Sequence, residues 1–128
     1  MIFVTDDGEG MLVKKQRSGI VFELADHVPN QVDFKMNFGK EEFERFVRHM
    51  NVVALEVWPS FKPKEAFSEA SDYDIYYCKE TDNNGYLRIN KKDFGITVER
   101  STPETQELFK FNKSKMQSFI YDLNKKEL

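Results

Sequence analysis

Two stretches of this chain decide the fold prediction: GYLRINKKDFGITVER at residues 85–100 and FKFNKSKMQSFIYDLN at residues 109–124. Each has a related stretch in the first half, GMLVKKQRSGIVFEL at residues 10–24 and FKMNFGKEEFERFVRHM at residues 34–50. A small module that recurs within one chain predicts an internal two-fold axis and a shared sheet.

The earlier and later stretches match position by position. At one common offset the matched positions are Gly10 with Gly85, Leu12 with Leu87, and Phe34–Asn37 with Phe109–Asn112. After the inserted residues Phe38 and Gly39, the apolar positions Phe43, Phe46, Val47 and Met50 match Met116, Phe119, Ile120 and Leu123. The second set recurs at i, i+3, i+4 and i+7, which predicts one apolar stripe on each of two helices.

These patterns predict an α+β fold of two tandem ββββα repeats, with antiparallel sheets and two amphipathic helices. Strands are expected at residues 2–5, 11–16, 19–24, 32–37, 52–58, 73–80, 86–90, 95–100 and 108–112, and helices at residues 40–50 and 113–125. Tight turns are expected at residues 17–19 and at residues 82–85, where Asn-Gly is a hairpin signature. Caps are expected at Asn37 or Gly39 and at Asn112.

The chain is long enough for one domain over residues 1–128. We expect the first repeat at residues 1–50, a linker with an extra strand at residues 51–72, and the second repeat at residues 73–128. A single ββββα unit has a poor core, because one helix covers only part of the apolar face of four strands. Two units are therefore expected to pack together and to leave their other sheet faces open.

Alternation along the strands predicts which side chains face outward. In the second repeat the outward set is Tyr86, Arg88, Asn90 and Lys110, and the buried set is Leu87, Ile89, Phe109 and Phe111. In the first repeat the outward set is Met11, Val13 and Lys35, and the buried set is Leu12, Phe34 and Met36.

An open sheet face that mixes aromatic and basic groups suits single-stranded nucleic acid, because bases stack on rings while Lys and Arg follow the phosphates. The candidate binding residues are Tyr86, Arg88, Lys91, Lys92, Arg100, Lys110 and Lys35. Tyr86, Arg88 and Lys110 are expected to make most of the contacts on one face. The alternative is that these are ordinary solvent-facing strand residues.

The second repeat, DIYYCKETDNNGYLRIN followed by LFKFNKSKMQSFIYDL, resembles the PUR repeat of purine-rich-element-binding proteins. The resemblance lies in an aromatic strand, a polar Gly turn, a strand of aromatic-aliphatic-basic-aliphatic form, and a last strand that runs into an amphipathic helix. The same plan occurs in Whirly proteins and in the positive-cofactor family of coactivators. The resemblance implies binding of single-stranded DNA or RNA, by a homodimer or a tandem pair.

Composition favours binding over catalysis. The chain has two histidines and one cysteine, so His27, His49 and Cys78 offer too few ligands for a metal site. The acidic turn at Asp6, Asp7 and Glu9 is expected to be solvated. We therefore expect no enzymatic activity, no metal and no cofactor. Trp58 suits either a core anchor or an exposed aromatic patch.

The charge distribution keeps a second function open. Residues 1–78 carry nine basic and fourteen acidic residues, whereas residues 79–128 carry ten and eight. An acidic surface can meet a basic partner, as in a protein-interaction or inhibitor module from a phage or mobile element. A ligand-binding or structural role is a third alternative. The interaction module would be favoured if one face gathers the acidic residues of the first half, namely Asp6, Asp7, Glu9, Asp26, Asp33 and the group at residues 41–44. Nucleic acid would be favoured if the basic side of the second-repeat strands is free of them.

The lone cysteine and the apolar runs, which are too short for a membrane span, predict a cytoplasmic protein with no membrane partner.

Overall fold

The computed structural model describes residues 1–125, and these residues form an α+β fold with two four-stranded antiparallel sheets and two α-helices. The first half contains β1 Ile2–Val4, β2 Gly10–Gln16, β3 Gly19–Leu24, β4 Asp33–Asn37 and α1 Lys40–Val57. The second half contains β5 Ile75–Cys78, β6 Asn83–Asn90, β7 Gly95–Glu99, β8 Glu107–Phe111 and α2 Lys113–Asn124. The short 3-10 turns η1 Glu69–Ser71 and η2 Lys91–Asp93 complete the described elements.

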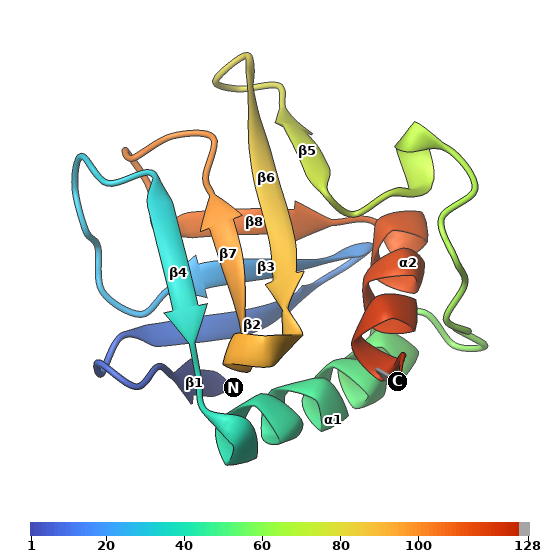
Figure 1. Ribbon diagram of the computed structural model, residues 1–128. Coiled ribbons are helices and arrows are strands. Elements are labelled where there is room, and N and C mark those ends of the chain that lie inside the picture. The colour runs from blue at the N-terminus through green and yellow to red at the C-terminus, as the bar shows by residue number, and fades with distance from the viewer. Residues whose placement is uncertain (126–128) are drawn as a thin grey trace.

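The two sheets pack face to face. Each sheet contains three strands from one half of the chain and one strand from the other half. Sheet A has the order β1-β2-β3-β8, and sheet B has the order β4-β7-β6-β5. In Figure 1 the strands of sheet B run across those of sheet A, with α1 and α2 along two sides of the pair. The third strand of each half therefore pairs with the fourth strand of the other half, β3 with β8 and β7 with β4.

The strand registers correspond between the halves. Phe22 of β3 pairs with Phe109 of β8, and Val98 of β7 pairs with Phe34 of β4. Val13 of β2 lies opposite Phe22, as Leu87 of β6 lies opposite Val98. The equivalent pairing agrees with a two-fold relation between the halves. That the two halves superimpose when one is rotated onto the other stays a prediction.

The same registers correct the sequence alignment at β2. Met11 and Val13 are buried, whereas Leu12 is half-buried on the outer side, so the expected faces of this strand were reversed. Met11 and Val13 thus correspond to Gly85 and Leu87. The match of Gly10 with Gly85 is therefore displaced by one residue. Because side chains alternate with period two, this displacement assigns every side chain of β2 to the wrong face.

The core between the sheets is rich in phenylalanine. Phe46 of α1 is fully buried, and its ring lies 5.3 Å from that of Phe3, 5.7 Å from that of Phe22 and 6.4 Å from that of Phe119. All three pairs meet edge to face, the arrangement that the ring quadrupole favours. The apolar stripes of both helices thus meet in one core, as the sequence pattern predicted.

The expected strand at residues 52–58 is wrong, because α1 continues to Val57. Val53 and Ala54 are buried and extend the stripe of Phe43, Phe46 and Met50 by another turn. The β-branched residues Val52 and Val53 favour strands, but the helical period of the stripe overrides that local preference. The first helix therefore uses part of the expected linker.

Two other local expectations need correction. The turn between β5 and β6 lies at residues 79–82, with Asp82 in the left-handed region, so Asn83 to Gly85 belong to the strand. Gly85 is buried there, and a Cβ atom would lie 3.3 Å from the Glu99 carbonyl oxygen. The α1 N-cap is Gly39 at φ 82°, without a side-chain cap, whereas Asn112 caps α2 as expected by accepting from the Lys115 N–H.

Candidate interaction face

The outer face of sheet B carries the central residues of the predicted site. Tyr86 and Arg88 both lie on the exposed side of β6, with Leu87 between them in the core, as the alternation predicted. Cross-strand partners point to the same side of a sheet. One row across this face is Asp33, Glu99, Tyr86 and Ile75, and the next row is Lys35, Thr97 and Arg88.

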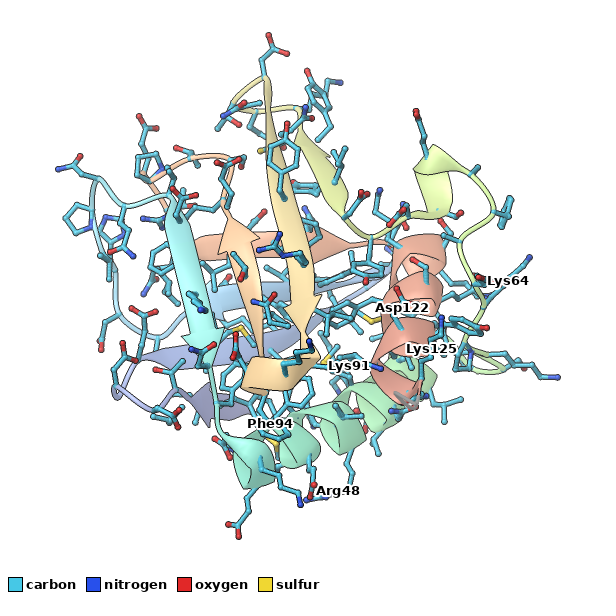
Figure 2. All side chains as sticks on the ribbon, in the orientation of Figure 1. Arg48, Lys64, Lys91, Phe94, Asp122 and Lys125 are labelled. Atoms are coloured by element: carbon cyan, nitrogen blue, oxygen red, sulfur yellow. The ribbon has the colours of Figure 1, made fainter. Side chains whose placement is uncertain are left out.

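The other basic residues of the predicted binding site lie in different parts of the structure. Lys35 is exposed on β4, where its ammonium lies 3.7 Å from the Asp93 carboxylate. Lys92 is exposed in η2, and the half-buried Lys91 donates to the backbone carbonyl of Lys125. Lys91 and Lys125 lie close together beside α2 in Figure 2. Only Lys35 therefore joins Tyr86 and Arg88 on the face of sheet B itself.

Lys110 and Arg100 do not join this face. Lys110 lies on β8 in sheet A, opposite Val21, so the expectation that it shares a face with Tyr86 is wrong. Arg100 is only 1% exposed, and its guanidinium donates to the carbonyl oxygens of Gln31, Thr105 and Val28. A side chain enclosed in this way cannot reach a phosphate in solution. Arg100, a candidate binding residue in the sequence analysis, is therefore not available on the face of Tyr86 and Arg88.

Carboxylates surround Tyr86 and Arg88. They line an open hollow of about 630 Å³, which we call the acidic depression; its lining residues are Asp33, Asp72, Asp74, Glu99, Asp122, Tyr73, Tyr86, Leu87, Arg88 and Thr97. Asp122 lies on α2, where it is labelled in Figure 2. Within residues 1–125, Arg88 forms no ion pair, and neither do Asp33 and Glu99. The depression therefore presents more negative than positive charge to a partner.

The chemistry of the depression follows from partial burial. Burial raises the pKa of the Asp74 carboxyl, and the neighbouring charge of Asp72 raises it further. Burial also raises the pKa of the Tyr73 hydroxyl, which donates to Asp122 at 2.8 Å. Lys115, close to both aspartates, donates to the Asp72 carbonyl oxygen at 2.7 Å, and burial lowers the pKa of its ammonium. Five carboxylates thus line the depression, and the positive charges nearby are Arg88 in its lining and Lys115 beside Asp72 and Asp74.

The sequence analysis missed this grouping. Asp33 and Glu99 lie opposite each other only because β4 pairs with β7, and α2 contributes Asp122 to the lining. The one local signal was the run Asp72-Tyr73-Asp74, which places two carboxylates next to an aromatic strand.

The acidic residues of the first half do not share one face. The Asp6 N–H donates to the carbonyl of Asn37 at the end of β4, and Asp33 begins the same strand. Glu42 reaches the Val4 N–H at 2.8 Å, at the same end as Asp6. The acidic residues between Asp6 and Glu44 thus lie in at least two groups, and of these Asp33 alone lines the acidic depression.

The candidate catalytic and metal-binding groups are dispersed. His27 is exposed in a loop, and the His49 ring lies 5.5 Å from the ring of Phe3. Cys78 is buried at the end of β5. Within residues 1–125, no three His, Cys, Asp or Glu side chains gather in a way that suits a metal ion. Trp58 is half-buried and stacks on Phe61, in agreement with an anchoring role.

Neither α-helix of the described chain has the length and apolar character needed to cross a membrane.

We compared the chain with protein-family models, with curated proteins and with solved structures, and none of these comparisons returned a match. The structure defines the chain as an α+β protein with two crossed antiparallel sheets. The resemblance to PUR repeats and Whirly proteins remains a hypothesis.

Proposed function

We propose that this chain is a non-catalytic interaction module that binds a positively charged protein partner through the outer face of sheet B. The observation that carries the proposal is the acidic depression, in which Asp33, Glu99 and Asp74 lie around the exposed Tyr86 ring. Complementary charge speeds encounter and selects partners, and an exposed tyrosine offers apolar area with a polar tip.

Like charges that face each other across a sheet destabilise it, and Asp33 and Glu99 are such a pair. A basic partner would remove this repulsion on binding. Arg88 adds one positive group within the depression, so the partner would place an acceptor opposite Arg88 and cations around it.

Single-stranded DNA or RNA is the second candidate partner. The exposure of Tyr86 and Arg88 on one side of β6 supports it, because stacking and phosphate contact need those two groups together. The surrounding carboxylates oppose it, because they would repel the phosphates. We therefore place this function second.

A titration with two labelled probes, oligolysine and a single-stranded DNA, at low and moderate salt tests the proposal. We expect oligolysine to bind and the DNA to bind much more weakly. The double variant Asp33→Asn, Glu99→Gln should weaken oligolysine binding several-fold, because two carboxylates of the face are neutralised. The matched control is Glu41→Gln, Glu44→Gln, which removes the same charge from exposed positions of α1 and should change binding less.

Two outcomes would contradict the proposal. Oligolysine that fails to bind at low salt, or that binds both double variants equally, would remove the acidic face as the site. DNA binding that is lost in the folded variant Tyr86→Ala, Arg88→Ala would establish the nucleic-acid function instead.

A further inference from the structure

The edge of sheet A at β1 is closed by side chains from α1. In an antiparallel pair, alternate residues direct their N–H and C=O groups away from the neighbouring strand. The Val13 N–H donates to the Met1 carbonyl, so on β1 the outward residues are Ile2 and Val4. The Arg45 guanidinium donates to the Ile2 carbonyl at 2.7 Å, and the Val4 N–H donates to Glu42 at 2.8 Å.

The corresponding edge of sheet B at β5 is open. The Leu87 N–H donates to the Asp74 carbonyl, so the outward residues of β5 are Ile75 and Tyr77. These occupy the places that Ile2 and Val4 hold on β1. Within residues 1–125, neither the Ile75 carbonyl nor the Tyr77 N–H has a hydrogen-bond partner.

The reason lies in two residues of α2. Aligning the apolar stripes of the helices places Lys115 where α1 has Glu42, and Ser118 where α1 has Arg45. The Lys115 ammonium donates to the Asp72 carbonyl at 2.7 Å, and the Ser118 hydroxyl donates to the Ser71 carbonyl at 2.6 Å. Both side chains therefore hold the segment that leads into β5 and leave the strand itself uncovered.

The open edge is apolar and surrounded by negative charge. The side chains of Ile75 and Tyr77 are 41% and 55% exposed. The sequence of β5 contains no lysine or proline of the kind that protects edge strands. Residues 69–82 contain five acidic residues and one basic residue. A hollow of about 380 Å³ beside the strand is lined by Glu69, Asp72, Asp74, Ile75, Tyr77 and Lys115.

We propose that β5 accepts an extended, basic segment of a partner protein as an additional strand of sheet B. The inference rests on the proposed function and names how the partner docks. Main-chain hydrogen bonds to the Ile75 carbonyl and the Tyr77 N–H would supply affinity, as in other cases of strand addition. Alternate side chains of the added strand would pack beside Ile75 and Tyr77, and its cations would face Asp72 and Asp74.

The charge of the edge selects this occupant over a second copy of the chain. Two β5 edges brought together would place two sets of carboxylates side by side, which is unfavourable. A segment that alternates basic and apolar residues complements both the exposed apolar side chains and the negative charge of the edge.

The probe for the experiment is a short, capped peptide in which lysine and valine alternate. Binding is followed by amide chemical shifts and hydrogen exchange in the full chain. We expect shifts centred on β5 and slower exchange of the Tyr77 N–H, because the added strand accepts a hydrogen bond from it. The same peptide with alternate backbone nitrogens methylated should bind roughly tenfold more weakly, since it cannot donate to the Ile75 carbonyl.

Tyr77→Pro is the matching change in the protein. The Tyr77 N–H points away from β6, so proline removes the edge donor without removing a hydrogen bond of the sheet. Tyr77→Val removes the same ring and its hydroxyl contact with Asp82 but keeps the N–H. We expect Tyr77→Pro to weaken peptide binding roughly tenfold relative to Tyr77→Val. If Tyr77→Pro does not fold, the N-methylated peptide and the exchange rate of the Tyr77 N–H in the parent protein carry the test, because both report on main-chain hydrogen bonds and leave the charge of the face unchanged.

The outcomes separate this inference from the function on which it rests. If the peptide binds equally well with and without N-methylation, or to Tyr77→Pro and Tyr77→Val, strand addition is wrong and the acidic face alone attracts the partner. If the alternating peptide does not bind while oligolysine does, the edge inference is wrong and the proposed function stands. If neither binds at low salt, both are wrong.

Discussion

Arg100 shows how one side chain can be structural although its type suggests a ligand contact. Its guanidinium donates to three backbone carbonyls in the segments around residues 28–31 and 105, and it lies 5.1 Å from the Phe34 ring. Buried cations are tolerated when their donors are satisfied, and Arg100 satisfies a donor on each of its nitrogens. It thus joins the loop before β4 to the loop before β8.

We expect Arg100→Met to lower the free energy of unfolding by about 3 kcal/mol, because buried carbonyls lose their donors. Urea denaturation checks this. Arg88→Met is the matched control, since Arg88 is exposed and forms no ion pair with any residue from 1 to 125, and it should change stability by less than about 0.5 kcal/mol. Similar losses in the two variants would contradict the structural role of Arg100.

Glu42 links the stability of the β1 edge to pH. The Arg45 side chain and then the Val4 N–H donate to its carboxylate, and together they lower its pKa from 4.5 to about 2. A depressed acid pKa stabilises the fold fully above the unfolded value, and this contribution is lost as pH falls through the folded value.

Glu42→Gln should therefore cost about 0.5–1 kcal/mol at neutral pH, as for an exposed ion pair. The difference from the parent should shrink as the pH falls from 4.5 toward 2. Thermal or urea unfolding measured at several pH values tests this. A difference that stays constant over that range would show that the carboxylate charge is not what stabilises this edge.

At the scale of the element, α1 has two distinct sides. Phe43, Phe46 and Met50 face the core, and Val53 and Ala54 continue that side. Val52 and Leu55 are more than half exposed on the opposite side. A helix with one buried stripe is stabilised mostly by tertiary packing, so substitutions on the two sides should differ strongly in effect.

Phe46→Ala should cost about 3–5 kcal/mol, because it leaves a cavity among several aromatic rings. Phe119→Ala on α2 should cost about as much, since that ring is equally buried and lies 6.4 Å from Phe46. Val52→Ala is the control on the same helix and should stay within about 0.5 kcal/mol of the parent. Denaturant melts give all three values, and a loss below about 1 kcal/mol for either phenylalanine would show that the helix faces were misassigned.

At the scale of the whole molecule, the exchange of fourth strands makes the halves depend on each other. Sheet A needs β8 from the second half, and sheet B needs β4 from the first. Each half alone would expose an unpaired edge and the apolar faces of Phe22 or Val98.

We therefore expect the fragments 1–64 and 65–128 to be unfolded when separate and to fold when mixed. Amide spectra should be poorly dispersed for each fragment and should resemble the intact chain for the mixture. A well-dispersed spectrum from either fragment alone would contradict the interdependence inferred from the strand order.

Local patterns determined much of the fold. The existence of both helices, the Asn112 cap, and the shared outward side of Tyr86 and Arg88 follow from periods of 3.6 and 2 and from capping, which depend on residues close in sequence. The same local reasoning failed at residues 52–58, where strand propensity competed with the helical stripe, and at β2, where a one-residue shift reversed the faces.

Only the tertiary structure determined which side chains share a surface and which are buried. The position of Lys110 on the other sheet, the burial of Arg100, and the meeting of Asp33 with Glu99 all depend on which distant strands pair. The open edge at β5 depends on which carbonyls Lys115 and Ser118 reach across the fold. Sequence periodicity specifies the direction of a side chain relative to its own element, whereas long-range pairing specifies its neighbours, and charge complementarity depends on those neighbours.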